Sequence, residues 1–339
     1  MQRTMNKFLI EKGLLELTRA NESGFEQQEP IKTKENLTIQ LLDTGVLVVE
    51  PDTPNDSDLI ISSGVHGNET APIEMVDELV KKIINGSLKV RARTLFIIGN
   101  AVAMNQSERF VIENMNRLFN GKHQGKDHHE AERAKKLENY VTDFFNKRSD
   151  ARRFHYDLHT AIRGSKYKKF AIYPFPDGRD WDKHQLEFFL ASGVNTVLLG
   201  HQPSGTFSYF SSHQFSAHAF TVELGKVKPF GENNMQEFSA MMQNLERLIQ
   251  GETIPTQPFN NSDFNLFQVK DELVKQSDNF KLNIADDVEN FTDFEEGFVL
   301  TEDIDGGYTV QKTGEAIVFP NAKIPNGQRA GLVVEKTQL

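Results

Sequence analysis

Hydrophobic positions follow two alternating patterns along the first 250 residues. Short apolar runs typical of buried β-strands are separated by longer stretches with helical spacing. The predicted strands are 59–63, 94–99, 154–158, 170–173, 196–199 and 219–222, with a hairpin over 36–50. The predicted helices are 5–20, 71–85, 130–147, 181–191 and 235–249. This alternation predicts an α/β domain in which helices cover both faces of a central sheet.

The pattern changes after Gly251. The segment GETIPTQPFNNSD, residues 251–263, contains two prolines and several turn formers, which indicates a linker. Short β-type runs follow, and Gly306-Gly307 separates two of them at a hairpin position. The predicted runs are 264–270, 280–284, 297–301, 308–312 and 316–319. We therefore predict one domain at residues 1–250 and a smaller, mostly β domain at residues 252–339.

Composition and charge narrow the classes of function. The 339 residues include no cysteine, which excludes disulfides, thiolate zinc sites and a thiol nucleophile. The net charge of −10 argues against binding to nucleic acid or to an anionic membrane surface. No span approaches the roughly 18 apolar residues of a membrane helix, and Glu11 and Lys12 interrupt the N-terminal apolar stretch, unlike a signal peptide. We expect a cytoplasmic protein, with homo-oligomerisation left open.

Three predicted strands run into residues that can bind a metal or act as a base. SSGVHGNET, residues 62–70, places His66 and Glu69 on a glycine-containing loop, although a His-x-x-Glu pair alone is weak evidence. Two later strands run into His159 and Glu223. Sites in open α/β sheets form beyond the carboxyl ends of strands. His66, Glu69 and His159 would then form a three-ligand zinc site of the catalytic type, with Glu223 as general base.

Plainer interpretations apply to several of these residues. Glu223 has the alternative of an ordinary strand-end carboxylate, and Asp157 is either a support for His159 or a structural group. Seven of the other histidines have interpretations of their own. A solvated position is expected for His123, His128 and His129, and a structural role for His155. Candidates for lining a pocket are His201, His213 and His218. The chain lacks the nucleophile elbow, the phosphate-binding loop, the dinucleotide fingerprint and the H-E-x-x-H helix.

Positive charge is concentrated near the predicted metal ligands. Residues 100–121 contain Arg109, Asn116 and Arg117, and four cations follow His159 at positions 163, 166, 168 and 169. Ordinary surface charge is the favoured interpretation for the last two of these, both lysines. In a chain of net charge −10, such a cluster indicates an anionic small-molecule substrate, and the arginine fork suits carboxylates.

Four motifs in order carry a resemblance to a known family. They are GVHGNE at 64–69, NAVAMNQSERFVIENMNRLF at 100–119, DLHT at 157–160 and VELG at 222–225. With them the chain resembles the aspartoacylase and succinylglutamate desuccinylase family, a branch of the zinc carboxypeptidase superfamily. The resemblance covers nearly the whole chain. Within the family, IVFPNAKIPNGQRAGL at 317–332 is similar to the bacterial branch that removes succinyl groups at the end of the arginine succinyltransferase route.

The resemblance implies a fold and a catalytic centre. The fold is a three-layer α/β zinc carboxypeptidase-like domain with a central mixed sheet, followed by the smaller β domain. The implied ligands of one Zn²⁺ per chain are His66, Glu69 and His159. Glu223 is implied as the base and then the proton donor, and Arg109 as the group that polarises the scissile carbonyl.

The resemblance also implies a substrate, with one departure from the family pattern. The implied reaction is hydrolysis of N-succinyl-L-glutamate to succinate and L-glutamate, with Asn116 and Arg117 holding a substrate carboxylate. We add Arg163 as our own candidate for another carboxylate contact. Aspartoacylases carry an arginine about ten residues before the catalytic glutamate, where this chain has His213 in SSHQFSAHAF. That departure favours an acidic substrate other than N-acetylaspartate.

Two alternatives to this function stay open. The first is another N-acyl amino acid deacylase, or a carboxypeptidase, that uses the same centre. The second is a non-catalytic zinc-binding sensor, against which the presence of Glu223 argues, because a binding protein has no need of a general base.

Overall fold

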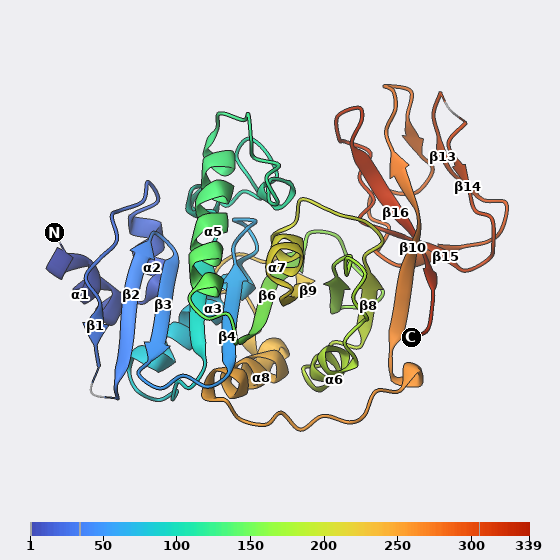
Figure 1. The fold of residues 1–339 in the computed structure, drawn as a ribbon. Helices are drawn as coiled ribbons and strands as arrows, with labels where there is room; N and C mark the ends of the chain where they lie inside the picture. The colour runs from blue at the N-terminus through green and yellow to red at the C-terminus, as the bar shows by residue number, and fades with distance from the viewer. Residues whose placement is uncertain (1, 34, 305) are drawn as a thin grey trace.

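The computed structural model describes residues 2–33, 35–304 and 306–339. A sheet of 13 strands crosses this part of the chain in the order β1-β2-β3-β5-β4-β6-β9-β7-β8-β10-β16-β15-β12 (Figure 1). The first nine strands are β1 Ile31–Lys32, β2 Leu37–Asp43, β3 Val46–Pro51, β4 Ser57–Ser63, β5 Arg93–Ile98, β6 Arg152–Ala161, β7 Phe170–Tyr173, β8 Thr196–Leu199 and β9 His218–Lys226.

Eight α-helices and three short 3₁₀ turns accompany these strands in the described residues. The helices are α1 Gln2–Lys12, α2 Leu14–Ala20, α3 Thr70–Ile84, α4 Ala101–Asn105, α5 His129–Asn146, α6 Lys183–Ala191, α7 Phe207–Phe215 and α8 Ser239–Gln250. The 3₁₀ turns are η1 Met115–Arg117, η2 Met235–Phe238 and η3 Asn261–Asp263. Each helix and strand predicted in the first 250 residues has a counterpart, although the 5–20 segment forms two helices, and β1, α4 and α7 are additional.

The sheet is mixed, as predicted. Strands β5, β4, β6 and β9 are parallel to one another, whereas β3 pairs antiparallel with β5 and β7 pairs antiparallel with β9 at the two sides of that group. The parallel strands are buried throughout most of their length, and the central runs of β4 and β5, residues 59–61 and 95–98, are continuously apolar rather than alternating.

Two apolar layers hold helices against the sheet. Helices α1, α2, α3, α6 and α8 pack on one face around Leu79, Phe189 and Leu245. Helices α5 and α7 pack on the other face around Leu137 and Phe207. The helix–sheet–helix arrangement is therefore the three-layer α/β domain that the sequence predicts.

The prediction of one continuous helix over residues 5–20 is wrong, because Gly13 divides this segment into two helices, α1 and α2. Gly13 has φ +91°, and a Cβ there would lie 2.4 Å from Lys81 Cε and 2.5 Å from Asp77 Oδ1. Asp77 also accepts a hydrogen bond from the backbone N–H of Leu15 at 2.9 Å. The close contact with α3 therefore breaks the helix where glycine alone fits.

The C-terminal segment is mostly β-structure, as expected. Its strands are β10 Asn265–Val274, β11 Lys281–Leu282, β12 Thr292–Phe294, β13 Val299–Glu302, β14 Tyr308–Thr309, β15 Glu315–Val318 and β16 Arg329–Lys336. Strands β12 and β16 were not predicted. Strands β11, β13 and β14 form a second, three-stranded sheet.

The junction between the two predicted domains runs through the main sheet. An extended segment follows α8 and leads to β10, which pairs in parallel with β8 and antiparallel with β16 (Figure 1). Backbone hydrogen bonds therefore join the C-terminal strands to the α/β layer. The domain boundary at residues 250–252 stays a prediction, because the pairing of β10 with β8 does not show which part of the chain folds by itself.

Candidate active site

The loop between β4 and α3 places two of the predicted ligands. His66 and Glu69 lie on this loop, and both are buried. Gly67 between them packs so closely on α4 that a Cβ there would lie 2.2 Å from the backbone nitrogen of Met104. The Gly67 N–H also donates to the carbonyl oxygen of Arg109 at 3.1 Å. Glycine in the G-V-H-G-N-E motif thus allows the backbone approach that fixes the loop.

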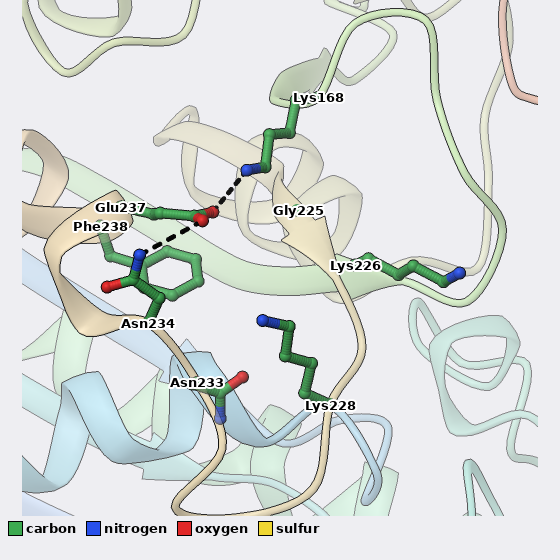
Figure 2. A pocket seen from close by; sticks show the side chains of 8 residues that line it. All are labelled: Lys168, Gly225, Lys226, Lys228, Asn233, Asn234, Glu237 and Phe238. Atoms are coloured by element: carbon green, nitrogen blue, oxygen red, sulfur yellow. Dashed lines mark hydrogen bonds and ion pairs between the residues drawn. The ribbon is translucent and has the colours of Figure 1, made fainter.

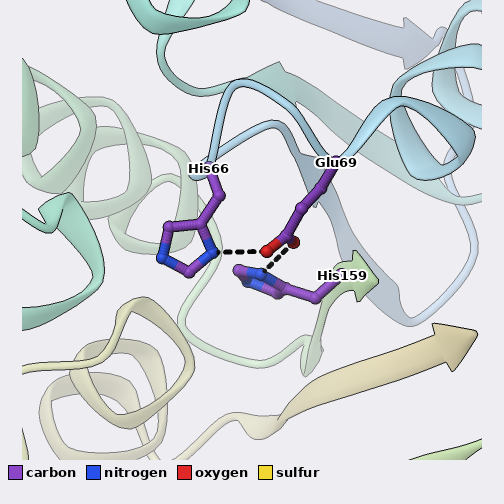
Figure 3. A group of neighbouring side chains, drawn as sticks. All are labelled: His66, Glu69 and His159. Carbon is purple, nitrogen blue, oxygen red and sulfur yellow. Dashed lines mark hydrogen bonds and ion pairs between the residues drawn. The ribbon is translucent and has the colours of Figure 1, made fainter. Parts of the chain in front are cut away.

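His66, Glu69 and His159 come together at the carboxyl end of the sheet. Glu69 lies between the two imidazoles, with 2.8 Å from its Oε1 to His66 Nδ1 and 2.8 Å from its Oε2 to His159 Nδ1 (Figure 3). One potential ligand atom from each residue lies within 4.8 Å of the others. This buried His-Glu-His group could hold a metal ion, and its nitrogen and oxygen donors suit zinc.

Hydrogen bonds behind the group orient both histidines. Asp157 Oδ2 lies 2.8 Å from His159 Nε2, and Ser62 donates its hydroxyl to Asp157 Oδ1 at 2.5 Å. His66 Nε2 lies 2.9 Å from Asn114 Oδ1. Each imidazole therefore has its Nδ1 atom toward Glu69, and its Nε2 atom is held by Asn114 or by Asp157. Such a hydrogen bond to the second nitrogen fixes the ring orientation of a ligating histidine.

The charge distribution of the group also fits a cation. Burial lowers the pKa of His66 to about 4, helped by Arg109, so this imidazole is neutral at pH 7. Burial acts to lower the pKa of His159 too, but Asp157 and Glu69 outweigh it and raise that pKa well above its usual value. The carboxylates around His159 therefore favour an added positive charge, and one ion could supply it.

Glu223 lies beside the group without belonging to it. In the parallel pairing of β6 and β9, Glu223 is the register partner of His159. Its side chain is buried, and its Oε2 has no hydrogen-bond partner among the described residues. Burial and the nearby Glu69 raise the pKa of Glu223 to about 7. A carboxyl with such a pKa can take up and release a proton near neutral pH.

The predicted arginines lie next to this centre. Arg109 donates from Nη1 to Glu69 Oε1 at 2.6 Å, and its side chain is 30% exposed. Arg117 is exposed to solvent, and its Nη1 donates to the carbonyl oxygen of Asn116 at 2.7 Å. Asn116 is buried, and its Oδ1 accepts from the backbone N–H of Phe207, which leaves the amide NH₂ as the donor end.

The cations that follow His159 are engaged elsewhere. Arg163 donates to the carbonyl oxygens of Asp286 and Val288, the latter at 3.0 Å. Lys166 pairs with Asp293. These contacts tie the segment after β6 to the C-terminal part of the chain, and the role proposed for Arg163 stays a prediction.

A cavity of about 180 Å³ lies beyond the end of β9 (Figure 2). Lys168 and Lys228 contribute to its lining, and Lys168 pairs with Glu237 across 2.6 Å. The three residues of the His-Glu-His group are not among the residues that line it. The cavity is therefore distinct from the metal-type centre.

Sequence reasoning missed Asn114 as a partner of His66. Its only sequence signal was its place in the 100–119 motif, because nothing in the spacing shows that it reaches a residue 48 positions earlier. Among the histidines, His155 is fully buried between Ser62 and Ser211, as its structural interpretation requires. His213 pairs with Asp177 at 3.0 Å and stacks on Tyr209.

The fold and the centre together define a hydrolase-type α/β protein with a potential metal site at strand ends. Family models agree with this class. The Succinylglutamate desuccinylase/Aspartoacylase catalytic domain matches residues 55–249, and the AstE/AspA barrel-sandwich hybrid domain matches residues 262–337. The chain belongs to the succinylglutamate desuccinylase/aspartoacylase family.

Individual relatives cover nearly all of the chain. The succinylglutamate desuccinylase of Shewanella amazonensis is 47% identical over 331 residues, 95% of either chain. That of Idiomarina loihiensis is 46% identical over 335 residues, 97% of either chain. The crystal structure of the succinylglutamate desuccinylase from Chromobacterium violaceum superposes with a TM-score of 0.84 at 38% identity, covering 96% of this chain and 98% of that one.

A structure from Vibrio parahaemolyticus with the same described activity superposes with a TM-score of 0.88 at 35% identity, covering 97% of this chain and 96% of that one. Within the described residues, no helix has the length and apolar character needed to cross a membrane.

Proposed function

We propose that this protein hydrolyses the amide bond of N-succinyl-L-glutamate to succinate and L-glutamate with the help of one Zn²⁺. The observation that carries the chemistry is the buried His-Glu-His group with the unpartnered Glu223 Oε2 beside it. The choice of substrate rests on the names of relatives that are 46–47% identical over nearly the whole chain. The family resemblance makes arginine catabolism by the succinyltransferase route the expected context.

His66, Glu69 and His159 are the residues that would hold zinc. They offer two imidazoles and one carboxylate, the donor set of catalytic zinc sites that leave a coordination position open. When bound, zinc supplies Lewis-acid polarisation of the scissile carbonyl and lowers the pKa of water.

Residues of this chain move the proton and stabilise the developing charge. The carboxylate of Glu223 accepts a proton from the water that attacks the amide carbon. Glu223 then delivers that proton to the nitrogen of the leaving amine. The guanidinium of Arg109 donates to the carbonyl oxygen as negative charge develops on it. Arg109 donates to Glu69, and both of these residues influence the charge of Glu223, so Glu223 and Arg109 are near enough to act on one reacting carbonyl.

The substrate is held through its carboxylates. Asn116 and Arg117 bind a carboxylate of the amino-acid half, for which the amide donor and the planar guanidinium are suited. Arg163 is the proposed contact for a further carboxylate. A cytoplasmic location accords with a small-molecule substrate of central metabolism.

Release of free amine from a panel of N-acyl amino acids, with and without a chelator, tests this function. N-succinylglutamate should be the preferred substrate, and chelation should abolish turnover until zinc is restored. Preference for a peptide C-terminus or for another acyl group would instead select the alternative deacylase or carboxypeptidase. Zinc binding without any turnover would select the sensor.

A further inference from the structure

The loop that carries Arg109 contains no helix or strand and turns its apolar side chains toward solvent. It joins α4 to η1 over residues 106–114. Within it, Phe110, Val111 and Ile112 are 37%, 41% and 60% exposed. Burial of these apolar side chains therefore contributes little to fixing the loop, and its conformation depends on polar contacts.

Glu130 of α5 supplies such contacts at the centre of the loop. Its Oε1 accepts hydrogen bonds from the backbone N–H groups of Val111 at 2.7 Å and Ile112 at 3.3 Å. The side chain is fully buried, and its Oε2 lies 3.5 Å from His128 Nδ1. Hydrogen bonds to a carboxylate are roughly twice as strong as those to a neutral acceptor. Glu130 therefore binds the backbone of the loop firmly to α5.

The start of α5 is itself fixed to the sheet. Arg133, three residues after Glu130 and on the same side of the helix, is also buried. It donates to the carbonyl oxygens of Gly99 and Thr44, at 2.7 Å in each case. Gly99 directly follows β5, so these contacts hold the start of α5 against the end of that strand. Glu130 is thus a fixed point to which the loop is attached.

The residues that flank the backbone held by Glu130 reach the metal-type group. Arg109 lies two residues before the first of the two N–H groups and donates to Glu69 at 2.6 Å. Asn114 lies two residues after the second, and its Oδ1 is 2.9 Å from His66 Nε2. A shift of the backbone between these residues would therefore move both side chains relative to the group.

We propose that Glu130 is a positioning residue that holds Arg109 and Asn114 against the metal-type group through the backbone between them. The proposal rests on the proposed function for the role of Arg109 at the reacting carbonyl, whereas the contact made by Asn114 does not depend on that role. The alternative is that Glu130 only stabilises the fold. Glu138, further along α5, offers a matched control, because it accepts from the backbone N–H of Gly121 at 3.2 Å, outside the 106–114 loop.

Kinetics on the zinc-loaded enzyme test the route through Arg109. Glu130→Ala should lower kcat for N-succinylglutamate at least about tenfold, since a misplacement of about 1 Å can cost on the order of a hundredfold. KM should change less, because Arg109 acts on charge that develops in the transition state. In Arg109→Ala, the further change Glu130→Ala should lower kcat by no more than about twofold, because the group that it positions is already absent. Glu130→Gln keeps an oxygen that can accept both N–H groups, so it should recover most of the loss.

Zinc affinity, measured by competition with a chelator and without turnover, tests the route through Asn114. Asn114→Ala should weaken zinc binding by about 10- to 100-fold, and Glu130→Ala should weaken it by at least about threefold, a part of that effect. The double variant should bind zinc within about twofold of Asn114→Ala. Glu138→Ala should leave both kcat and zinc affinity within about twofold of the wild type.

Losses that multiply in either double variant would overturn the proposal, because Glu130 would then act independently of Arg109 or Asn114. Wild-type kcat and zinc affinity in Glu130→Ala, or equal losses in Glu138→Ala, would overturn it too. If Glu130→Ala does not fold, Glu130→Asp replaces it in both comparisons, since the shorter side chain keeps the charge and loses the reach. If the wild type fails to hydrolyse N-succinylglutamate, the proposed function fails, and the zinc measurement still tests Glu130 separately.

Discussion

Asp157 Oδ2 lies 2.8 Å from His159 Nε2, on the ring edge opposite the Nδ1 atom that faces Glu69. Both residues belong to β6 and are two positions apart, so their side chains leave the same face of the strand. The carboxylate therefore fixes the orientation and the protonation of the imidazole.

Replacing Asp157 with asparagine should weaken zinc binding by about 10- to 100-fold, the usual effect of losing such a support. The measurement is competition with a chelator of known affinity. Asp177→Asn is a matched control, because it removes a carboxylate from His213 outside the centre. Unchanged zinc affinity in Asp157→Asn would mean that Asp157 has only a structural role.

The metal content of the purified protein should be about one zinc per chain, as for a single three-ligand site. His66→Ala and His159→Ala should each lose both the metal and the activity, because two donors cannot complete the site. Elemental analysis and amine release measure the two effects, with His213→Ala as the control. Full activity in metal-free protein would refute the assignment.

Glu223→Gln should keep the zinc and lose at least about a hundredfold in kcat, the lower range for removal of a general base. The amide has nearly the same shape and cannot accept the proton. Metal content and kcat are measured on the same preparation. Loss of zinc would make Glu223 a ligand, and near-normal turnover would place the base on another residue.

Turnover should fall on the acid side as Glu223 becomes protonated. A general base is active when ionised, so activity is present above its pKa and lost as the pH falls through it. Burial and Glu69 raise the pKa of Glu223 to about 7 without a metal, and a nearby divalent cation favours the carboxylate. The acid limb of kcat/KM should therefore lie below pH 7 in zinc-loaded enzyme. Persistence of this limb in Glu223→Gln would assign it to another group.

N-succinylglutamate should exceed N-acetylglutamate in kcat/KM by at least about thirtyfold. It carries one more carboxylate, and loss of a charged partner in a desolvated site costs on the order of 2–5 kcal/mol. Arg117→Lys should weaken both substrates, because the fork is lost with either acyl group.

Arg163→Ala distinguishes two roles for that side chain in the same assay. A smaller ratio of kcat/KM between N-succinylglutamate and N-acetylglutamate would support a contact of Arg163 with the acyl carboxylate. An unchanged gap would leave Arg163 with its hydrogen bonds to the carbonyl oxygens of Asp286 and Val288. Equal values for both substrates on the wild type would contradict succinyl selectivity itself.

The sequence alone determined the α/β class and the elements that carry the centre. Apolar runs ending in His159 and Glu223 are local signals, and parallel strands deliver their carboxyl ends to one edge. The GVHGNE motif at residues 64–69 directly follows the predicted strand 59–63, so it placed His66 and Glu69 on the loop at the carboxyl end of that strand. Strand β16 was not predicted because Gly331 interrupts a short apolar run, which weakens the strand pattern.

Only the tertiary structure decided which distant side chains meet. Asn114 with His66, Arg109 with Glu69, and Glu272 with both Arg329 and His201 are contacts between residues far apart in sequence. Periodicity reports which face of an element is buried, but it carries no information on which other element covers that face. The register of β6 against β9, and the pairing of β10 with β8, supply that information here. They bring Glu223 beside His159, and they bring Glu272 on β10 near His201 in the loop after β8.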